Sequence, residues 1–360
     1  MIETSTKSYP VYIGHGIVPI LEELWNRAEV KYTSVMVITD ETVANLHLSS
    51  FRERAGVGHF FEKVVPSGEM AKTFDVYYDC LSAALENKLD RKSLIIAFGG
   101  GAVGDLAGFV AATFMRGIRF IQVPTTILAH DSAVGGKVAI NHPLGKNMVG
   151  AFHQPEAVIY DLDFIESLPE KEIRSGFAEV IKHSLISDEG FYNWLREEIR
   201  SLKTIKQAHM LEFLTKGIQI KGSVVAMDER ETGVRAHLNF GHTLGHAIEA
   251  EAGYGKVTHG EAVAIGMLFA LQLSREEYKL DFNLEEFKIW LQSLGYKTSL
   301  PSGLSIDSLL VRMKQDKKTV GNSVRYVLLK QIGEPQVSEV EESVLLSSLR
   351  KFKEEGESYD

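Results

Sequence analysis

The first half of the chain alternates short runs of β-branched and apolar residues with stretches of helical spacing. Each run ends in a polar or glycine-rich turn, and the clearest runs are residues 34–38, 93–98, 119–123 and 157–160. Helical patterns cover residues 72–88 and 106–115. Strands separated by helices of this length are typical of βαβ units. The sequence therefore predicts an α/β N-terminal domain built on a mostly parallel, Rossmann-like sheet.

The pattern changes after Leu168-Pro169. In residues 170–226 and 242–273 the apolar positions recur every three or four residues, and few segments resemble strands. We therefore expect a mainly α-helical C-terminal domain, so that the domains are residues 1–168 and 169–360. The charged residues 351–360 are expected to form a frayed terminus.

Composition narrows the function classes. A chain of 360 residues with 44% hydrophobic residues can bury the cores of two globular domains. Its 39 Lys and Arg against 48 Asp and Glu give a net charge of −9, the opposite of what a nucleic-acid backbone favours. The single cysteine, Cys80, excludes an intrachain disulfide and a multi-cysteine zinc module. Residues 1–10 are polar and no apolar run reaches the length of a membrane span, so we expect a cytoplasmic protein without nucleic-acid or membrane partners.

A glycine cluster follows the second of the predicted strands. Residues 99–105 read GGGAVGD and contain G-x-G-x-x-G, before a helix expected to begin near Leu106. Glycines let backbone amides approach a pyrophosphate, and a helix N-terminus favours negative charge. A merely tight turn explains the cluster about equally well. The polar loops 39–42, 67–72 and 125–126 favour a nucleotide site, because they also follow strands and ligands of such sheets bind at that edge.

Two glycine-rich loops, residues 131–137 and 141–147, carry two lysines and an asparagine. These side chains suit an anionic, oxygen-rich substrate, whereas the alternative is a pair of solvated surface lysines. The apolar residues around the loops predict that they pack inside the protein; these residues are Val134, Val138, Ile140, Leu144, Met148 and Val149.

Three segments of the second half carry possible metal ligands. Helical spacing places Glu179 and Lys182 on one face, together with Ser175. His242 and His246 are four residues apart, on a stripe with Asn239 and Glu249, and His259 follows on a glycine-flanked turn. One carboxylate and two imidazoles with an open position form a catalytic zinc site. A histidine pair of this spacing is also often structural, and the residues alone leave open which histidines are ligands.

The chain resembles the 3-dehydroquinate synthase family, sugar phosphate cyclases of the shikimate pathway, over essentially its whole length. The matching segments are residues 99–109, 116–118, 124–126, 134–137, 141–147, 150–152, 178–182, 228–231, 239–247 and 259–263. The resemblance implies that Glu179, His242 and His259 bind one divalent metal ion, Zn²⁺ or Co²⁺. It leaves His246 to contact the substrate.

The resemblance also implies an NAD site and a substrate pocket. The NAD site would comprise Asp40, Ser67, Gly68, Glu69, Met70, Ala71, Lys72, Gly100, Gly101, Ala102, Val103, Gly104, Asp105, Thr125, Thr126, Lys137, Lys146, Phe164, Ile165, Glu166 and Ser167. The substrate pocket would comprise Asp131, Lys137, Lys146, Asn147, Lys182, Lys221, Arg235, Asn239, His246 and one of Lys317 and Lys318.

The implied reaction converts 3-deoxy-D-arabino-heptulosonate 7-phosphate to 3-dehydroquinate and phosphate. It proceeds by transient NAD-dependent oxidation, phosphate elimination, reduction and an intramolecular aldol step, and the family leads us to expect a homodimer. Alternatives are another sugar phosphate cyclase, such as an aminodehydroquinate synthase, and a metal-dependent oxidoreductase similar to glycerol dehydrogenase. A non-catalytic NAD-binding protein on the same scaffold would not need the metal ligands and pocket lysines.

Overall fold

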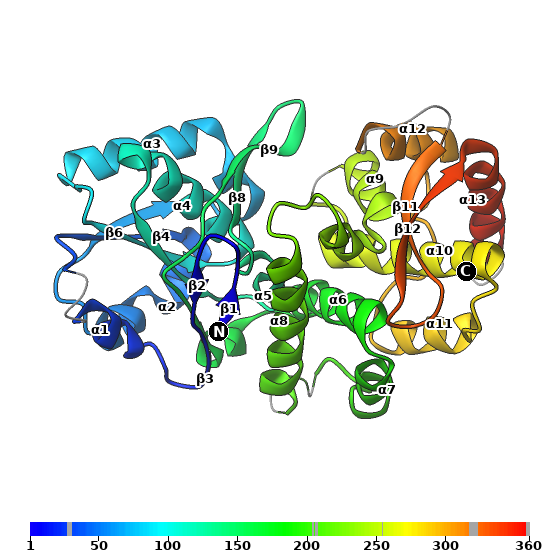
Figure 1. The fold of residues 1–360 in the computed structure, drawn as a ribbon, viewed down its shortest axis with the longest axis horizontal. Coiled ribbons are helices and arrows are strands. Elements are labelled where there is room, and N and C mark those ends of the chain that lie inside the picture. Colours follow the sequence, from blue (N-terminus) through cyan, green and yellow to red (C-terminus); the bar gives the residue numbers. More distant parts are fainter. Residues whose placement is uncertain (27–30, 204, 206–207, 254, 317–322, 358–360) are drawn as a thin grey trace. The chain divides into compact units, whose positions relative to one another are not determined.

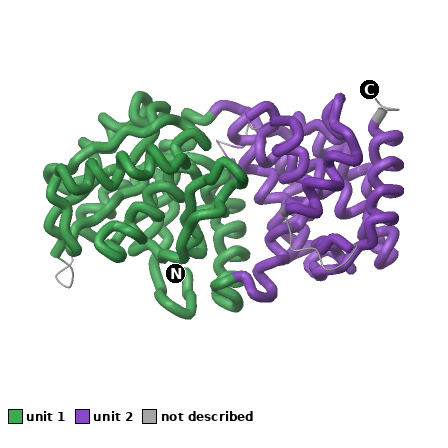
Figure 2. The backbone as a smooth tube through the Cα atoms, turned by 90° about the horizontal axis from the view of Figure 1, so that it is seen from above, with its two compact units in different colours: residues 1–168, 211–230 green, residues 169–210, 231–360 purple. Residues whose placement is uncertain are grey.

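The computed structural model describes residues 1–26, 31–203, 205, 208–253, 255–316 and 323–357. The chain divides into two compact units, coloured separately in Figure 2. Unit 1 comprises Met1–Leu168 and Leu211–Arg230, and unit 2 comprises Pro169–Met210 and Glu231–Asp360. The expected boundary after residue 168 coincides with one of these division points, but residues 211–230 group with unit 1. Among the described residues, no helix combines the length and apolarity that a membrane span requires.

Unit 1 contains the parallel sheet that the sequence predicted. Its strand order is β3-β10-β7-β6-β4-β5, and all neighbouring strands in it are parallel. The strands are β3 Val11–Gly14, β4 Val35–Asp40, β5 Phe61–Val65, β6 Leu94–Gly99, β7 Arg119–Pro124 and β10 Ala157–Asp161. The four predicted strands are therefore confirmed as β4, β6, β7 and β10. A short antiparallel pair, β1 Ile2–Glu3 and β2 Ser8–Tyr9, precedes them.

Both faces of this sheet are covered, which explains why its four inner strands are mostly apolar. In β4, Met36 and Ile38 join one buried cluster with helices α3 and α4, while Val35 and Val37 join another on the opposite face with α1 and α2. The helical segments of this unit are α1 Ile20–Trp25, α2 Glu41–Arg54, η1 Gly68–Lys72, α3 Phe74–Glu86, α4 Gly101–Thr113, η2 Phe114–Arg116, α5 Ala129–Ser132, η3 Leu162–Ser167 and α8 Met210–Met227. The helix after the glycine cluster thus begins at Gly101, five residues before the expected start.

An antiparallel hairpin, β8 Lys137–His142 and β9 Gly145–Phe152, extends from the rest of unit 1 (Figure 1). Its inner face packs through Val138 and Ile140 into the cluster beneath α4. The expectation that the whole segment packs inside was wrong for its tip, because Leu144 is 91% exposed and Met148 is 72% exposed. Successive side chains of a strand point to opposite faces of the sheet. A two-stranded hairpin that packs on one side therefore buries one face and leaves the other exposed.

Unit 2 is mainly helical, as predicted. Its helices are α6 Glu170–Ser187, α7 Glu189–Glu198, η4 Val234–Asn239, α9 His242–Ala252, α10 His259–Tyr278, α11 Leu284–Ser293, α12 Ile306–Asp316 and α13 Glu342–Glu357. Helix α10 is buried along most of its length and packs against α6 and α9. Two features differ from the sequence prediction. An antiparallel hairpin of β11 Ser323–Leu329 and β12 Pro335–Glu341 is present, and the terminal segment is helical to Glu357 instead of frayed.

Candidate active site

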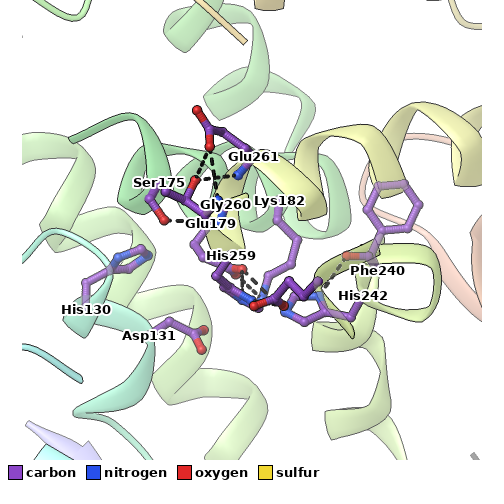
Figure 3. Close-up of polar contacts among 12 residues, drawn as sticks. His130, Asp131, Ser175, Glu179, Lys182, Phe240, His242, His259, Gly260 and Glu261 are labelled. Atoms are coloured by element: carbon purple, nitrogen blue, oxygen red, sulfur yellow. Dashed lines mark hydrogen bonds and ion pairs between the residues drawn. The ribbon is translucent and has the colours of Figure 1, made fainter. Parts of the chain in front are cut away.

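Three side chains from different helices of unit 2 meet at one point. Glu179 lies in the middle of α6, His242 is the first residue of α9, and His259 is the first residue of α10. Nε2 of His242 lies 3.3 Å from Oε1 of Glu179, and Nε2 of His259 lies 3.2 Å from the same oxygen. Figure 3 shows both imidazoles turned toward Glu179 and Lys182. The structure therefore brings together the three residues that the resemblance implies as ligands.

Local sequence places His259 at its helix start. The Thr258 side chain accepts a hydrogen bond from the Glu261 amide, while the Glu261 side chain accepts one from the Thr258 amide, so the two form a capping box. The Gly260 amide donates to Ser175 Oγ at 3.1 Å, which ties the start of α10 to α6. A Cβ at Gly260 would lie 1.9 Å from the Ser175 carbonyl oxygen, so only glycine permits this approach.

His242 is placed by a second glycine. Gly241 has a φ of 79° and caps α9 in the left-handed conformation, which side chains other than glycine rarely adopt. A Cβ there would also lie 2.9 Å from the backbone nitrogen of Met267 in α10. The turn before His242 therefore packs directly on the helix that carries His259.

Charges around Glu179 favour its ionised form. Burial alone would raise the pKa of Glu179, but the Lys182 ammonium and His242 hold this pKa well below its ordinary value. Burial and the Lys182 charge lower the pKa of His242 to about 4. Burial opposes protonation of His259 as well, but Glu179 and Glu249 outweigh it and raise the pKa of His259 to about 10.

This donor set fits a divalent metal. One oxygen or nitrogen from each of Glu179, His242 and His259 lies within 4.8 Å of the others. Among the described residues, neither buried oxygen of Glu179 accepts a hydrogen bond of good geometry, although ionic partners surround it. A buried carboxylate with two imidazoles matches the ligands of a catalytic zinc site. His246, Glu249 and His259 form a second group within the same limit.

Three further residues of the predicted substrate pocket lie in unit 2, and one of them, Lys182, contacts this cluster. Nζ of Lys182 lies 2.5 Å from Oε2 of Glu179, and Arg235 in η4 is 1% exposed. The Asn239 amide donates to Oε1 of Glu231 at 3.0 Å. No role was predicted for Glu231 or Glu249. The available signals were that Glu231 lies in a segment matching the family and that Glu249 lies on the stripe of His242. Lys317 and Lys318 lie outside the described residues.

In unit 1 the glycine cluster forms the turn from β6 into α4, with Gly100 as the N-cap. Two of its glycines also allow close packing: a Cβ at Gly104 would lie 2.7 Å from Oε1 of Gln122, and a Cβ at Gly101 would lie 2.9 Å from Oγ of Ser132. The cluster thus combines a helix N-terminus at the carboxyl edge of the sheet with a tight turn. The interpretation as a tight turn is confirmed, and the nucleotide site stays a prediction.

Polar side chains gather at the same edge. Asp40 caps α2 by accepting hydrogen bonds from the amides of Thr42 and Val43, and Ser67 donates to its Oδ1 at 3.1 Å. The amide of the buried Thr125 donates to the Gly99 carbonyl. Phe164 and Ile165, both in the predicted NAD site, have buried side chains. Helix η3 therefore offers a ligand its backbone and its end residues instead of these two side chains.

A buried lysine joins the glycine-turn helix to the β8–β9 hairpin. Nζ of Lys72 lies 2.6 Å from Oδ2 of Asp105 and donates to Oδ1 of Asn147. Beside it, Nδ2 of Asn141 donates to Oε2 of Glu69 at 2.6 Å. Burial raises the pKa of Asp105 more than the Lys72 charge lowers it. Residues 67–72, predicted to bind NAD, and the loop 141–147, predicted to bind the substrate, are therefore connected directly.

Lysines of the predicted substrate pocket also occur in unit 1. Lys221 on α8 pairs with Asp131 at 3.0 Å and also donates to the Asp131 carbonyl. Lys137 and Lys146 lie on β8 and β9 of the hairpin. Helix α8 thus brings a residue from far along the chain to the α5 loop.

Two protein-family models match most of the chain. The model described as 3-dehydroquinate synthase N-terminal matches residues 62–175, and the model described as 3-dehydroquinate synthase C-terminal matches residues 176–319. The chain is 55% identical over 358 residues to a 3-dehydroquinate synthase of Geobacillus thermodenitrificans, covering 99% of this chain and 98% of that protein. It is 54% identical over 355 residues to a 3-dehydroquinate synthase of Bacillus cytotoxicus, covering 98% and 96%.

Solved structures with the same fold include two cyclases. A 2-deoxy-scyllo-inosose synthase complexed with carbaglucose-6-phosphate, NAD⁺ and Co²⁺ superposes with a TM-score of 0.88 at 26% identity, covering 98% of this chain and 99% of that one. A 2-epi-5-epi-valiolone synthase from Streptomyces hygroscopicus, with NAD⁺ and Zn²⁺ bound, gives 0.85 at 21% identity, covering 99% of each chain. A probable glycerol dehydrogenase from Sinorhizobium meliloti gives 0.66 at 16% identity, covering 97% and 98%.

Proposed function

The chain belongs to the 3-dehydroquinate synthase family, and we propose that it converts 3-deoxy-D-arabino-heptulosonate 7-phosphate into 3-dehydroquinate and inorganic phosphate. It is an enzyme of the cyclase type. The observation that carries the proposal is the cluster of Glu179, His242 and His259 beside Lys182, in a chain with this level of identity over nearly its full length. This activity belongs to the shikimate pathway.

NAD and one divalent metal ion are the cofactors. When bound, NAD would supply a hydride acceptor that is regenerated within the turnover, without net oxidation, and the metal would supply Lewis acidity to lower the pKa of a substrate hydroxyl. We propose that Glu179, His242 and His259 hold the metal and that the carboxyl edge of the sheet in unit 1 holds NAD. Domains 1–168 and 169–360, with α8 returning to unit 1, would then differ in the cofactor they bind.

The basic residues of unit 2 match the anionic groups of the substrate. Lys182 and Arg235 offer positive charge to the carboxylate and phosphate groups, and the planar guanidinium of Arg235 suits bidentate contact. The Nδ2 group of Asn239 donates to Glu231, so its Oδ1 remains oriented to accept from a substrate hydroxyl. His246 is the proposed group that takes and returns a proton at a substrate hydroxyl.

In unit 1 we assign substrate-binding roles to the ion pair of Lys221 and Asp131 and to residues of the β8–β9 hairpin. Lys221 is held against Asp131, which fixes its ammonium on α8. Lys137, Lys146 and Asn147 lie on the hairpin, where a buried Lys72 supports Asn147. Local clusters of cations can attract an anion even in a protein whose net charge is −9.

Two further properties belong to this proposal. The negative net charge and the absence of a membrane-length apolar helix among the described residues are consistent with a cytoplasmic enzyme. A homodimer is the expected assembly from the family resemblance, and size-exclusion chromatography with light scattering would measure it.

The test is incubation of the purified protein with heptulosonate 7-phosphate, catalytic NAD⁺ and Zn²⁺. We expect release of one phosphate per substrate, a product with the mass of 3-dehydroquinate, and no lasting rise in NADH absorbance. NADH formed in step with product would indicate a dehydrogenase instead. Turnover of the amino analogue of the substrate, with none of the heptulosonate, would indicate an aminodehydroquinate synthase.

A further inference from the structure

We propose that Glu249 is a positioning residue of the metal centre, which holds the His259 imidazole with Nε2 directed at Glu179. The inference rests on the proposed function, because it assigns a partner to one of the proposed ligands. Oε2 of Glu249 lies 2.9 Å from Nδ1 of His259, and both residues belong to unit 2. Glu249 is 8% exposed, two turns along α9 from His242.

The contact determines which nitrogen of His259 is available. A neutral imidazole carries one N–H donor and one acceptor nitrogen, whereas an ionised carboxylate only accepts hydrogen bonds. A neutral His259, the form that a metal ion requires, therefore carries its proton on Nδ1 and donates it to Glu249, which leaves the lone pair on Nε2. That nitrogen is the one that lies 3.2 Å from Glu179.

The other proposed ligand has an equivalent arrangement with a different acceptor. Nδ1 of His242 lies 3.1 Å from the backbone carbonyl of Phe240, and its Nε2 also faces Glu179. Both imidazoles thus present Nε2 to the same oxygen while Nδ1 is held from behind. For His242 the acceptor is a neutral carbonyl, whereas for His259 it is a charged side chain. A carboxylate acceptor raises the basicity of a ligating imidazole. Substitution of Glu249 can therefore remove the acceptor of His259, whereas the backbone acceptor of His242 has no side chain to replace.

A competing assignment makes Glu249 itself a ligand, together with His246 and His259. These three residues form the second group whose donor atoms lie within 4.8 Å of one another. In that assignment His259 would bind the ion through Nδ1, whereas its Nε2 and the Nε2 of His242 both face one oxygen of Glu179. The observed contacts of His259 on its two sides therefore favour the positioning role.

The experiment compares Glu249→Gln and Glu249→Ala with the parent protein and with Glu251→Gln. Glu251 lies two residues further along α9 and pairs with Arg312 at 2.6 Å, so it is a matched control for loss of one carboxylate from this helix. Each protein is stripped with a chelator, its fold is checked by circular dichroism, and its Zn²⁺ affinity is measured by competition with a chromophoric chelator. The absorption spectrum of the Co²⁺-loaded protein reports the ligand set.

We expect Glu249→Ala to weaken Zn²⁺ binding by roughly 10–100-fold, the range for loss of an outer partner of a ligating histidine. Glu249→Gln should lose less, because its amide oxygen still accepts from Nδ1, and the Co²⁺ spectrum should keep the parent's band positions in both variants. Glu251→Gln should bind like the parent.

Two results would overturn the inference while leaving the proposed function intact. One is parent-like Zn²⁺ affinity in Glu249→Ala. The other is a changed Co²⁺ spectrum with a far larger loss of affinity in both Glu249 variants, which would make Glu249 a ligand. If the parent protein itself binds neither ion, the metal centre of the proposed function fails and this inference fails with it.

Discussion

The amide of Gly260 donates to Ser175 Oγ at 3.1 Å, and a Cβ on Gly260 would lie 1.9 Å from the Ser175 carbonyl oxygen. Helices α6 and α10 therefore approach so closely that only a hydrogen atom fits at this point. The contact lies one turn before Glu179 on α6 and directly after His259 on α10. Backbone packing thus sets the separation between two of the proposed metal ligands.

Replacement of Gly260 by Ala should push these two helices apart. We expect the free energy of unfolding to fall by roughly 1–3 kcal/mol, the usual cost of overpacking, and Zn²⁺ affinity to fall with it. Gly190→Ala is the control, because that glycine is also helical but its Cβ would meet only a side-chain oxygen of Asp188 at 3.2 Å. Urea denaturation and chelator competition measure the two effects. Equal stability of the two variants would show that α10 can shift at no cost.

The second prediction separates His246 from the proposed ligands. His242→Ala and His259→Ala should each remove a metal bond, so metal affinity should fall by more than the roughly 10–100-fold typical of an outer contact. His246→Ala should keep about one metal per chain but lose roughly 10²–10⁴-fold in rate if its imidazole transfers a proton. Metal content by mass spectrometry and phosphate release measure both. Loss of metal from the His246 variant alone would favour the histidine pair that simple i, i+4 spacing indicates.

The third prediction concerns the buried pair of Lys72 and Asp105. Lys72→Met leaves Asp105 without its cation, and loss of one partner of a buried pair costs roughly 3–5 kcal/mol of unfolding free energy. We expect a value near the lower end, because the Asp105 side chain is 19% exposed. The double variant Lys72→Met/Asp105→Asn should recover part of this loss, as measured by urea denaturation. Strictly additive losses would mean that the two side chains are not coupled.

The fourth prediction concerns acid stability. Burial would raise the pKa of Glu229, but hydrogen bonds from Ser5, Thr6 and Gln154 lower it from 4.5 to about 2. A folded-state pKa below the unfolded value stabilises the protein above pH 4.5, and this contribution is lost as the pH falls toward 2.

Glu229→Gln should therefore unfold about 1–3 kcal/mol more easily than the parent at neutral pH. The difference should shrink as the pH is lowered through about 3, where the parent loses the same contribution. The exposed Glu86→Gln variant is the control and should stay within about 0.5 kcal/mol of the parent. Urea denaturation at both pH values gives the comparison, and a difference that is independent of pH would contradict the pKa assignment.

The sheet was predictable because the sequence pattern of each strand lies within a few consecutive residues. The strands β4, β6, β7 and β10 are mostly apolar and are followed by turn residues, since helices cover both faces of the sheet. The start of α4 was predicted too late, because glycine is a poor helix former, although α4 begins at Gly101. The β11–β12 hairpin was missed, since its pairing depends on partners that a single strand pattern does not specify.

The site was predictable to different degrees. The residues alone singled out Glu179 and three histidines as possible ligands, and only the family resemblance chose His242 and His259 over His246. The structure brings His242 and His259 to the same oxygen of Glu179, a relation between helices that no spacing along the chain encodes. Glu249 was placed on the stripe of the two histidines and Glu231 in a segment that matches the family. Neither was given a role, because a glutamate in a helical or loop pattern ordinarily indicates only a solvated surface.

The division of the chain has a consequence for synthesis on the ribosome. A nascent chain that has been synthesised as far as Leu168 already holds every strand of the six-stranded sheet. It lacks Glu229, which binds Ser5 and Thr6, and it lacks Lys221, which binds Asp131, because both arrive with residues 211–230. Helices α6 and α7 of unit 2 emerge in between. The two units therefore cannot be completed one after the other, and the N-terminal hairpin must wait for a partner that is translated after part of the next unit.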